Sequence, residues 1–282
     1  MHNNSRVKII IDGILIILAM IWTLLPLWWT FQTSISPEVD LTRIPPRWLP
    51  SSINFNYYNS ILFKKMGTTT AFRAGIFNSS VISITVAFLS VFLGSLAAYA
   101  IVRLNVLSGR WVIFTLLFAQ MIPPVILITS LYVIASKLHL LDTRFLLILI
   151  YSALQLPMAI WILRGYFQTI PREIEDSALI DGCSPSQVLF HIVLPLSGPA
   201  LFTTGIFTFI SAWGEFLMAL VFTSSLASKT MPVAIAEFMG RFTVDYGLMC
   251  TAGMIASVPP ILIAFIFQRF IIQGLTSGAV KG

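Results

Sequence analysis

Apolar residues are gathered in long runs along this chain, and shorter polar segments separate the runs. Six runs stand out, at about 9–31, 76–101, 111–135, 145–163, 199–222 and 248–272. A helix needs roughly 20 apolar residues to cross the hydrocarbon core of a bilayer, so each run is long enough for one crossing. The pattern therefore predicts an all-α, polytopic membrane protein with six transmembrane helices in one domain over residues 1–282.

The first run follows Arg6 and Lys8, as the apolar part of a signal peptide would. It is longer than that part of a signal peptide, and no cleavage site of small residues follows it. We therefore expect it to be a retained transmembrane helix.

Composition supports the membrane assignment. Hydrophobic residues make up 57% of the chain and charged residues 10%, with a mean hydropathy of +0.90. A soluble domain is typically about 25% charged. Six spans leave no room for a soluble catalytic domain. The pI near 9.5 fits basic residues at membrane interfaces, so nucleic-acid binding is not expected.

Three features give weaker signals. Pro123 and Pro124 interrupt the third run and Pro157 the fourth, which suits a water-lined pathway or ordinary packing between membrane helices. The 17 lysines and arginines divide almost equally between the two sides of the predicted topology, so charge bias does not orient the chain. Cys183 and Cys250 have no metal-ligand spacing, and no metal site is predicted.

The polar segment 171–199, between the fourth and fifth runs, has the features of two short helices outside the bilayer. Pro171 suits a helix start, and Gly182 suits the left-handed position that ends one. Ser184, Pro185 and Gln187 then form the pattern of a capping box, which starts a second helix. The residues alone leave a plain solvated loop equally open.

This segment resembles the EAA loop of ABC importer permeases, whose pattern is roughly E-A-A, then D-G-A, then an apolar run ending in L-P. The matching residues are Asp176, Ser177, Ala178, Asp181, Gly182, Cys183, Leu194 and Pro195. Asp176 stands where the family usually has Glu, and Ser177 and Cys183 replace alanines.

Further motifs are similar to those of the carbohydrate-uptake branch, the maltose- and trehalose-type permeases. They are Ala98-Tyr99-Ala100 with Arg103, Met121-Ile122-Pro123-Pro124, Arg164-Gly165-Tyr166-Phe167, Trp213-Gly214-Glu215-Phe216, Gln268-Arg269 and the tail 274–282. The resemblance covers a core of about 76–272, with a coupling loop at about 164–198.

The resemblance implies a transmembrane subunit that forms half of a pathway for a sugar or similar solute. The family's EAA helix couples to a cytoplasmic ATPase, which implies a coupling set of Glu175, Asp176, Ala178, Asp181 and Gly182. The tail would be a secondary docking element. The resemblance also implies a bacterial or archaeal cytoplasmic (inner) membrane location with both termini cytoplasmic.

Several partners follow from the same resemblance. The sequence has no phosphate-binding loop of the G-x-x-x-x-G-K-[ST] type, so an ABC ATPase dimer must use ATP and Mg in trans, and this chain binds no cofactor and is not itself an enzyme. A second homologous permease, an extracytoplasmic solute-binding protein at the loop 223–246, and membrane lipid complete the set.

Polar residues inside the predicted spans are candidates for the solute pathway. They are Glu215, Trp213, Asn78, Gln120, Tyr151 and Gln155. A carboxylate facing lipid is costly, so Glu215 should face a cavity, a partner or another polar side chain. Trp213 could stack on a sugar ring. The residues alone slightly favour the other account, in which Glu215 pairs at a helix–helix interface and Trp213 packs.

Two other classes compete with the importer. An ion-driven secondary transporter would carry charged relays and internal repeats, and a membrane enzyme would need a catalytic cluster around His2, His139 or His191. Within the ABC permeases, a carrier for a non-sugar solute stays open.

Overall fold

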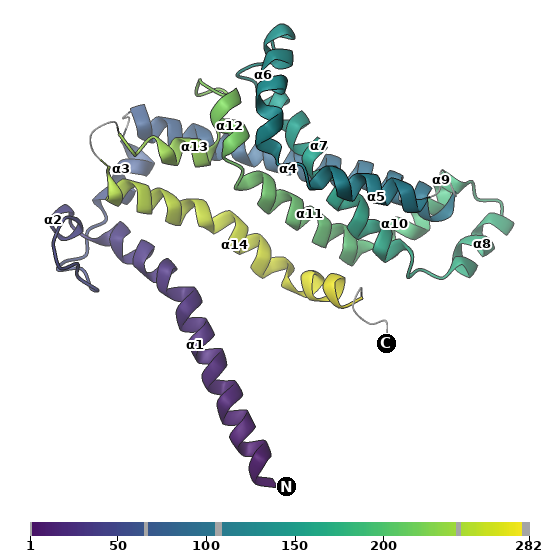
Figure 1. The fold of residues 1–282 in the computed structure, drawn as a ribbon, viewed down its shortest axis with the longest axis horizontal. Helices are drawn as coiled ribbons and strands as arrows, with labels where there is room; N and C mark the ends of the chain where they lie inside the picture. The colour runs from purple at the N-terminus through teal and green to yellow at the C-terminus, as the bar shows by residue number, and fades with distance from the viewer. Residues whose placement is uncertain (1, 65–66, 105–108, 241–243, 278–282) are drawn as a thin grey trace. The chain divides into compact units, whose positions relative to one another are not determined.

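The computed structural model describes residues 2–64, 67–104, 109–240 and 244–277 (Figure 1). The regular elements in these ranges are helices. In chain order they are α1 (His2–Ile35), α2 (Glu38–Leu41), α3 (Asn56–Phe63), α4 (Gly67–Arg103), α5 (Gly109–Gln120), η1 (Pro124–Leu127), α6 (Ile128–Lys137), α7 (Arg144–Phe167), α8 (Arg172–Ile180), α9 (Pro185–Val188), η2 (Leu189–Val193), α10 (Leu194–Leu196), α11 (Gly198–Trp213), α12 (Leu217–Phe222), α13 (Met231–Ala236) and α14 (Tyr246–Ser277).

Four of the described helices are long and apolar enough to span a membrane by themselves: Ile11–Ile35 of α1, α4, α7 and Tyr246–Phe270 of α14. Two further spans exist only as bent pairs. Trp111–Gln120 and Pro124–Lys137 meet at 83°, and Pro185–Leu196 and Gly198–Trp213 meet at 79°. With each pair counted as one span the described residues hold six, so the predicted all-α polytopic fold is confirmed.

The third predicted span is broken where the prolines indicate. Helix α5 ends at Gln120, and the chain resumes as a 3-10 turn with Pro124 in its first position. Proline has no backbone N–H to continue the helical hydrogen bonds, which explains the break at this point.

The fifth predicted span, 199–222, is not one helix. Helix α11 ends at Trp213, with Gly214 as its C-cap, and α12 begins at Leu217. The apolar pattern runs through this break, so the pattern alone gives no sign of it. Gly214 and the acidic residue Glu215 stand at the break.

The chain divides into two compact units. The first comprises residues 1–73 and 234–258. In this unit the polar segment after α1 contains the short helices α2 and α3. The Asn54 N–H donates to the Ile35 carbonyl at 2.8 Å, which joins this segment to the end of α1. The Ser51 N–H donates to the Asp40 carboxylate at 2.7 Å. The ring of Tyr57 lies directly over Gly247 of α14.

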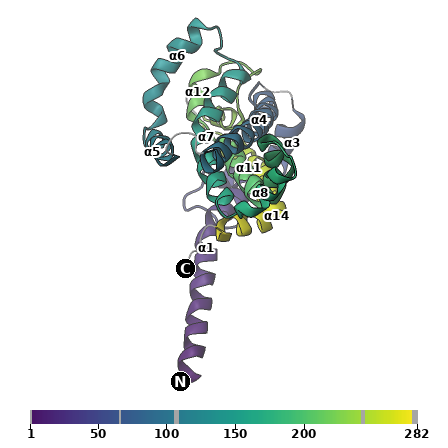
Figure 2. The same cartoon turned by 90° about the vertical axis from the view of Figure 1, so that its right-hand side faces the viewer.

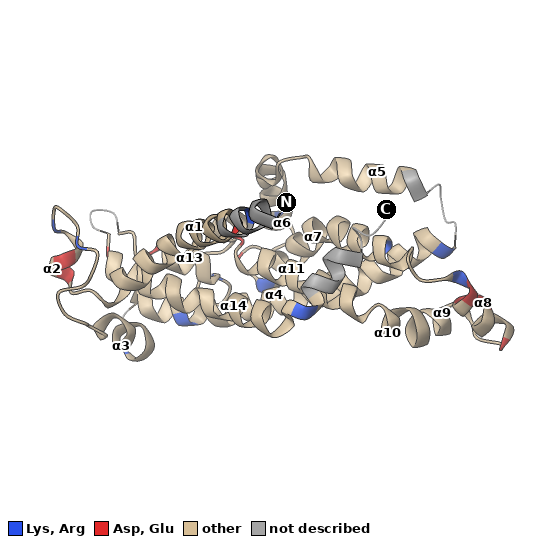
Figure 3. Cartoon of the chain, turned by 90° about the horizontal axis from the view of Figure 1, so that it is seen from below, with Lys and Arg blue, Asp and Glu red and all other residues tan. Residues whose placement is uncertain are grey.

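The second unit comprises residues 74–233 and 259–282. Helix α7 packs against α5, α11 and α12, and Gly94 lets α4 approach α7 closely at Ala159. Figure 2 shows α4, α7 and α11 nearly end-on as neighbours. Seen from below in Figure 3, charged residues lie mainly at helix ends and in connections, including α8, while the long helices are mostly uncharged.

Candidate functional site

Helix α8 lies outside the candidate spans, and α9 follows it at the same end of their unit (Figure 1). Helix α9 is the start of the bent pair Pro185–Leu196 and Gly198–Trp213. Pro171 is the N-cap of α8, so the helix begins at Arg172, one residue later than the sequence suggests. Gly182 has φ +93°, a conformation that side chains with a Cβ rarely adopt. Ser184 caps α9, and the predicted capping box with Gln187 is present.

The two faces of α8 differ. Glu175 and Ala178 point inward, with 5% and 8% of their surfaces exposed. Asp176 and Asp181 are exposed, and Ile180 is 86% exposed. Ile174 and Leu179 are also exposed, at 43% and 44%. The exposed surface of α8 therefore presents several apolar side chains beside two acids, which is a surface suited to a protein partner.

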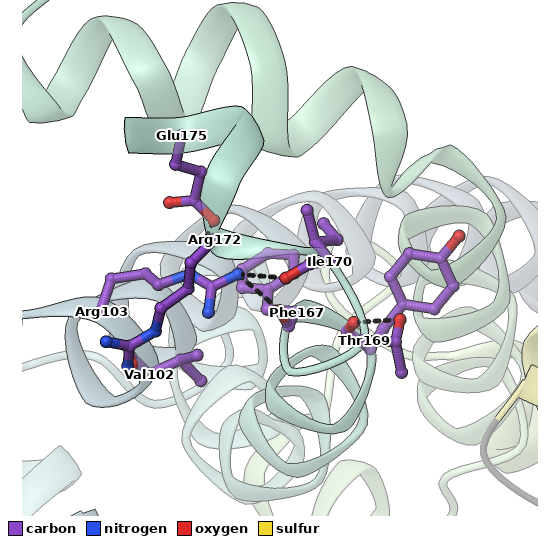
Figure 4. Close-up of polar contacts among 8 residues, drawn as sticks. Val102, Arg103, Phe167, Thr169, Ile170, Arg172 and Glu175 are labelled. Atoms are coloured by element: carbon purple, nitrogen blue, oxygen red, sulfur yellow. Dashed lines mark hydrogen bonds and ion pairs between the residues drawn. The ribbon is translucent and has the colours of Figure 1, made fainter. Parts of the chain in front are cut away.

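The inner face is fixed by Arg103, the last residue of α4 (Figure 4). Its Nε donates to the Glu175 carboxylate at 2.6 Å. One terminal nitrogen donates to the carbonyls of Phe167 at 3.0 Å and Ile170 at 2.8 Å. Arg172 reaches back to the Val102 carbonyl at 3.3 Å. These bonds fasten the start of α8 to the end of α4.

A second cluster lies on α7 among the predicted pathway residues. The Gln120 amide donates to the Leu154 carbonyl at 2.8 Å. The Gln155 amide donates to Ser211 Oγ at 2.5 Å, and the Tyr151 hydroxyl donates to Glu215 at 2.5 Å. Gln120 ends α5 and Glu215 follows α11, so both broken spans meet α7 along the same turn.

Glu215 also satisfies the backbone at the break. One carboxylate oxygen accepts the Met218 N–H at 2.9 Å, and the other accepts the Ala219 N–H at 3.2 Å. The first N–H groups of a helix have no partner within it, and leaving them unpaired in a membrane is costly. The carboxylate thus stabilises the start of α12 by accepting these two N–H groups.

Two of the six pathway candidates lie apart from this cluster. Trp213 is 4% exposed, and its ring stacks on Phe209 with centroids 5.6 Å apart. Asn78 is 1% exposed, and its amide donates to the carbonyls of Leu226 at 3.0 Å and Lys229 at 2.8 Å. Both residues hold the protein's own structure in place.

Asp142 forms a clasp that no sequence pattern predicts. Its carboxylate accepts the N–H groups of Ser224 at 2.8 Å and Ser225 at 2.9 Å, and the hydroxyl of Ser228. Burial raises the pKa of Asp142, but these hydrogen bonds lower it by more, so the pKa lies below its usual range. The clasp ties the loop after α12 to the start of α7.

Sequence reasoning also missed two residues of the α8 region. Arg103 was quoted only as part of a motif, and its role becomes visible when α8 folds back onto α4. Ile180 is an apolar residue in an acidic segment outside the spans, and that mismatch was a usable signal. Residues 278–282 of the tail lie outside the described residues.

Comparison with known proteins gives the family and the fold. A family described as "Binding-protein-dependent transport system inner membrane component" matches residues 90–277. The chain is 36% identical over 261 residues to the sulfoquinovosyl glycerol transport system permease protein SmoH of Agrobacterium fabrum, covering 92% of this chain and 89% of that protein.

Another relative is the trehalose/maltose transport system permease protein MalG of Thermococcus litoralis, 35% identical over 99% of this chain and 98% of its own length. Among solved structures, one chain of a bacterial ABC transporter for alginate import is similar with a TM-score of 0.79 at 22% identity, covering 94% of this chain and 97% of that one.

Proposed function

This chain belongs to the family of inner-membrane components of binding-protein-dependent transport systems, and we propose that it forms half of an importer's pathway for a sugar or sugar-like solute. The family members are permease subunits, and their ATPase is a separate subunit. Relatives whose names specify trehalose, maltose and sulfoquinovosyl glycerol support the sugar assignment.

The observation that carries the coupling role is the outer face of α8. Ile180 is 86% exposed on a short helix outside the spans, with Asp176 and Asp181 exposed beside it. We assign these residues and the turn at Gly182 to the contact with the ATPase. Glu175 and Ala178, also in the predicted coupling set, face inward and set the position of α8.

The topology follows from this contact. With α8 in the cytoplasm, both termini are cytoplasmic, and the loop 223–246 is external, where a solute-binding protein would dock. A second, homologous permease would complete the pathway. Closure of the ATPase dimer on ATP would move two coupling helices and switch the spans between inward- and outward-open states.

For the solute pathway we propose the polar cluster around residues 151–155 of α7, with Gln120, Ser211 and Glu215, rather than all six predicted residues. Gln120 and Ser211 are exposed there, and Gln155 and Glu215 are partly exposed, although they lie among membrane spans. Exposed amides and a carboxylate at this depth suit a surface that faces water and solute hydroxyls. Trp213 and Asn78 are occupied in internal contacts.

The experiment that tests the assignment compares Ile180→Asp with Val39→Asp in the detergent-solubilised complex. Val39 is 79% exposed on α2, so the two changes are matched in chemistry and exposure. We expect Ile180→Asp to weaken retention of the cytoplasmic ATPase on the order of 30-fold, the scale of an interface hot spot, and Val39→Asp to leave it unchanged. Equal retention in both variants would contradict the docking face.

A further inference from the structure

Helix α4 is a continuous rod beside two broken spans. It runs over 37 residues without a proline, which corresponds to about 55 Å at about 1.5 Å per residue. The third span is bent by 83° at the break after Gln120, and the predicted fifth span is interrupted between α11 and α12. Rigid secondary elements are among the structures that carry coupling between distant sites, and an unbroken helix is more rigid than a broken span.

One end of α4 is joined to α8 by a desolvated ion pair. The side chains of Arg103 and Glu175 are 10% and 6% exposed, and one terminal nitrogen of Arg103 also donates to two carbonyls. Separating such a pair would leave a buried charge without a partner, which costs far more than moving the two groups together. A displaced α8 therefore carries the end of α4 with it.

Toward its N-terminal end, at residues 75–79, α4 is joined to the loop after α12. Asn78 holds the carbonyls of Leu226 and Lys229, and Ser79 Oγ accepts the Met231 N–H at 2.9 Å. A Cβ on Gly75 would lie 3.0 Å from the Met231 backbone, so the chains are in direct contact there. Asn78 and Arg103 are about 38 Å apart along the helix.

We propose that α4 is a connecting rod between the coupling helix and the loop 223–230, with Glu175, Arg103 and Asn78 as its positioning residues. Movement of α8 by the ATPase shifts this external loop, and a solute-binding protein seated on the loop biases α8 in return, since coupling between two sites is reciprocal. This inference rests on the proposed function and adds a route between its two docking surfaces.

The test uses the complete transporter in proteoliposomes and measures the ratio of ATPase rates with and without solute-loaded binding protein. Glu175→Gln, Asn78→Ala and their double variant are compared with Glu38→Gln, an exposed acid on α2. Each single change is expected to lower the stimulation ratio on the order of 5- to 100-fold, the range of allosteric couplings, and Asn78→Ala should leave ATPase retention unchanged. Glu38→Gln should behave as the native chain.

The double variant separates a rod from two independent structural contacts. The effects of changes at two distant, independent sites normally add. If both changes interrupt the same route, the second has nothing further to remove, so the double variant should match the worse single variant. The inference would be overturned if the fold-losses of the two single variants multiplied in the double variant, or if Asn78→Ala left the stimulation ratio unchanged. If the Glu175→Gln complex fails to assemble, the stimulation ratio of Asn78→Ala is the test.

Failure of the inference can be told from failure of the proposed function. A native complex that shows no stimulated ATPase activity and retains no ATPase would refute the function itself. A native complex that is stimulated normally, together with variants that are stimulated equally well, would refute only the rod.

Discussion

The hydroxyl of Tyr151 donates to a carboxylate oxygen of Glu215 at 2.5 Å, across the space between α7 and the break that follows α11. The same carboxylate holds two N–H groups at the start of α12. A single acidic side chain thus fixes the position of the break and its distance from α7. The Glu215 carboxylate therefore has a structural role at the helix break, independent of any contact with solute.

Replacing this carboxylate by an amide tests that arrangement. In Glu215→Gln, one acceptor oxygen becomes a donor nitrogen, so at least one N–H or the Tyr151 hydroxyl loses its acceptor. We expect the free energy of unfolding to fall by about 1–3 kcal/mol, measured by thermal unfolding in detergent, and solute uptake to fall with it. Because the two residues share one bond, Tyr151→Phe and Glu215→Gln should be non-additive; additive losses would show that the bond contributes nothing.

Gly182 allows a test of conformation without a steric clash. A Cβ there would meet no atom within 4 Å, yet φ is +93°. Gly182→Ala should cost about 1–2 kcal/mol of local strain and weaken ATPase retention. The control is Gly165→Ala in α7, where a Cβ likewise meets nothing within 4 Å. Loss of retention in the control as well would trace the effect to something other than the turn.

Gly247 offers the opposite case, a steric clash without backbone strain. A Cβ there would lie 2.2 Å from Cζ of Tyr57, so the ring or the helix must move. We expect Gly247→Ala to lower the free energy of unfolding by about 1–3 kcal/mol. Gly253→Ala, on the same helix with open space around it, should not. Adding Tyr57→Ala removes the ring and should recover part of the loss; no recovery would rule out the clash as the cause.

The Asp142 clasp predicts a pH dependence with a definite sign. Since the pKa of Asp142 is lower in the folded protein than its ordinary value of about 3.9, its stabilisation is complete above that value and is lost as the pH falls toward the folded pKa. Asp142→Asn should therefore lower the free energy of unfolding by about 1 kcal/mol at pH 7, after solvent screening.

Thermal unfolding at several pH values checks this. The difference between the native chain and Asp142→Asn should be constant from about pH 7 to pH 5 and should shrink below about pH 4. Glu173→Gln serves as a control. A difference that shrinks already between pH 7 and pH 5 would mean that another group is responsible.

The sequence predicted those parts of the fold that depend on local chemistry. Apolar runs long enough for the bilayer gave the spans, Ser184 and Gln187 gave the capping box, and Gly182 gave the turn. The prolines at 123 and 124 gave the third-span break. Each of these signals lies within a few residues of the structure that it specifies.

The missed features depend on residues far apart in the chain. The break at Glu215 lies inside a continuous apolar run, and the carboxylate's role there includes Tyr151, 64 residues away. Arg103 and Glu175 are 72 residues apart, and Asp142 and Ser224 are 82 apart. Pattern and spacing carry no information on which distant groups meet, so these contacts required the folded structure.

Helix α1 has a consequence for how the protein is made. The span Ile11–Ile35 has a mean hydropathy of 2.1, so its own composition is enough to place it in lipid. It is the first of the six spans in chain order, and synthesis of the other five takes on the order of tens of seconds at about 5–20 residues per second. This helix can therefore enter the membrane alone and anchor the chain while the other spans are still being synthesised.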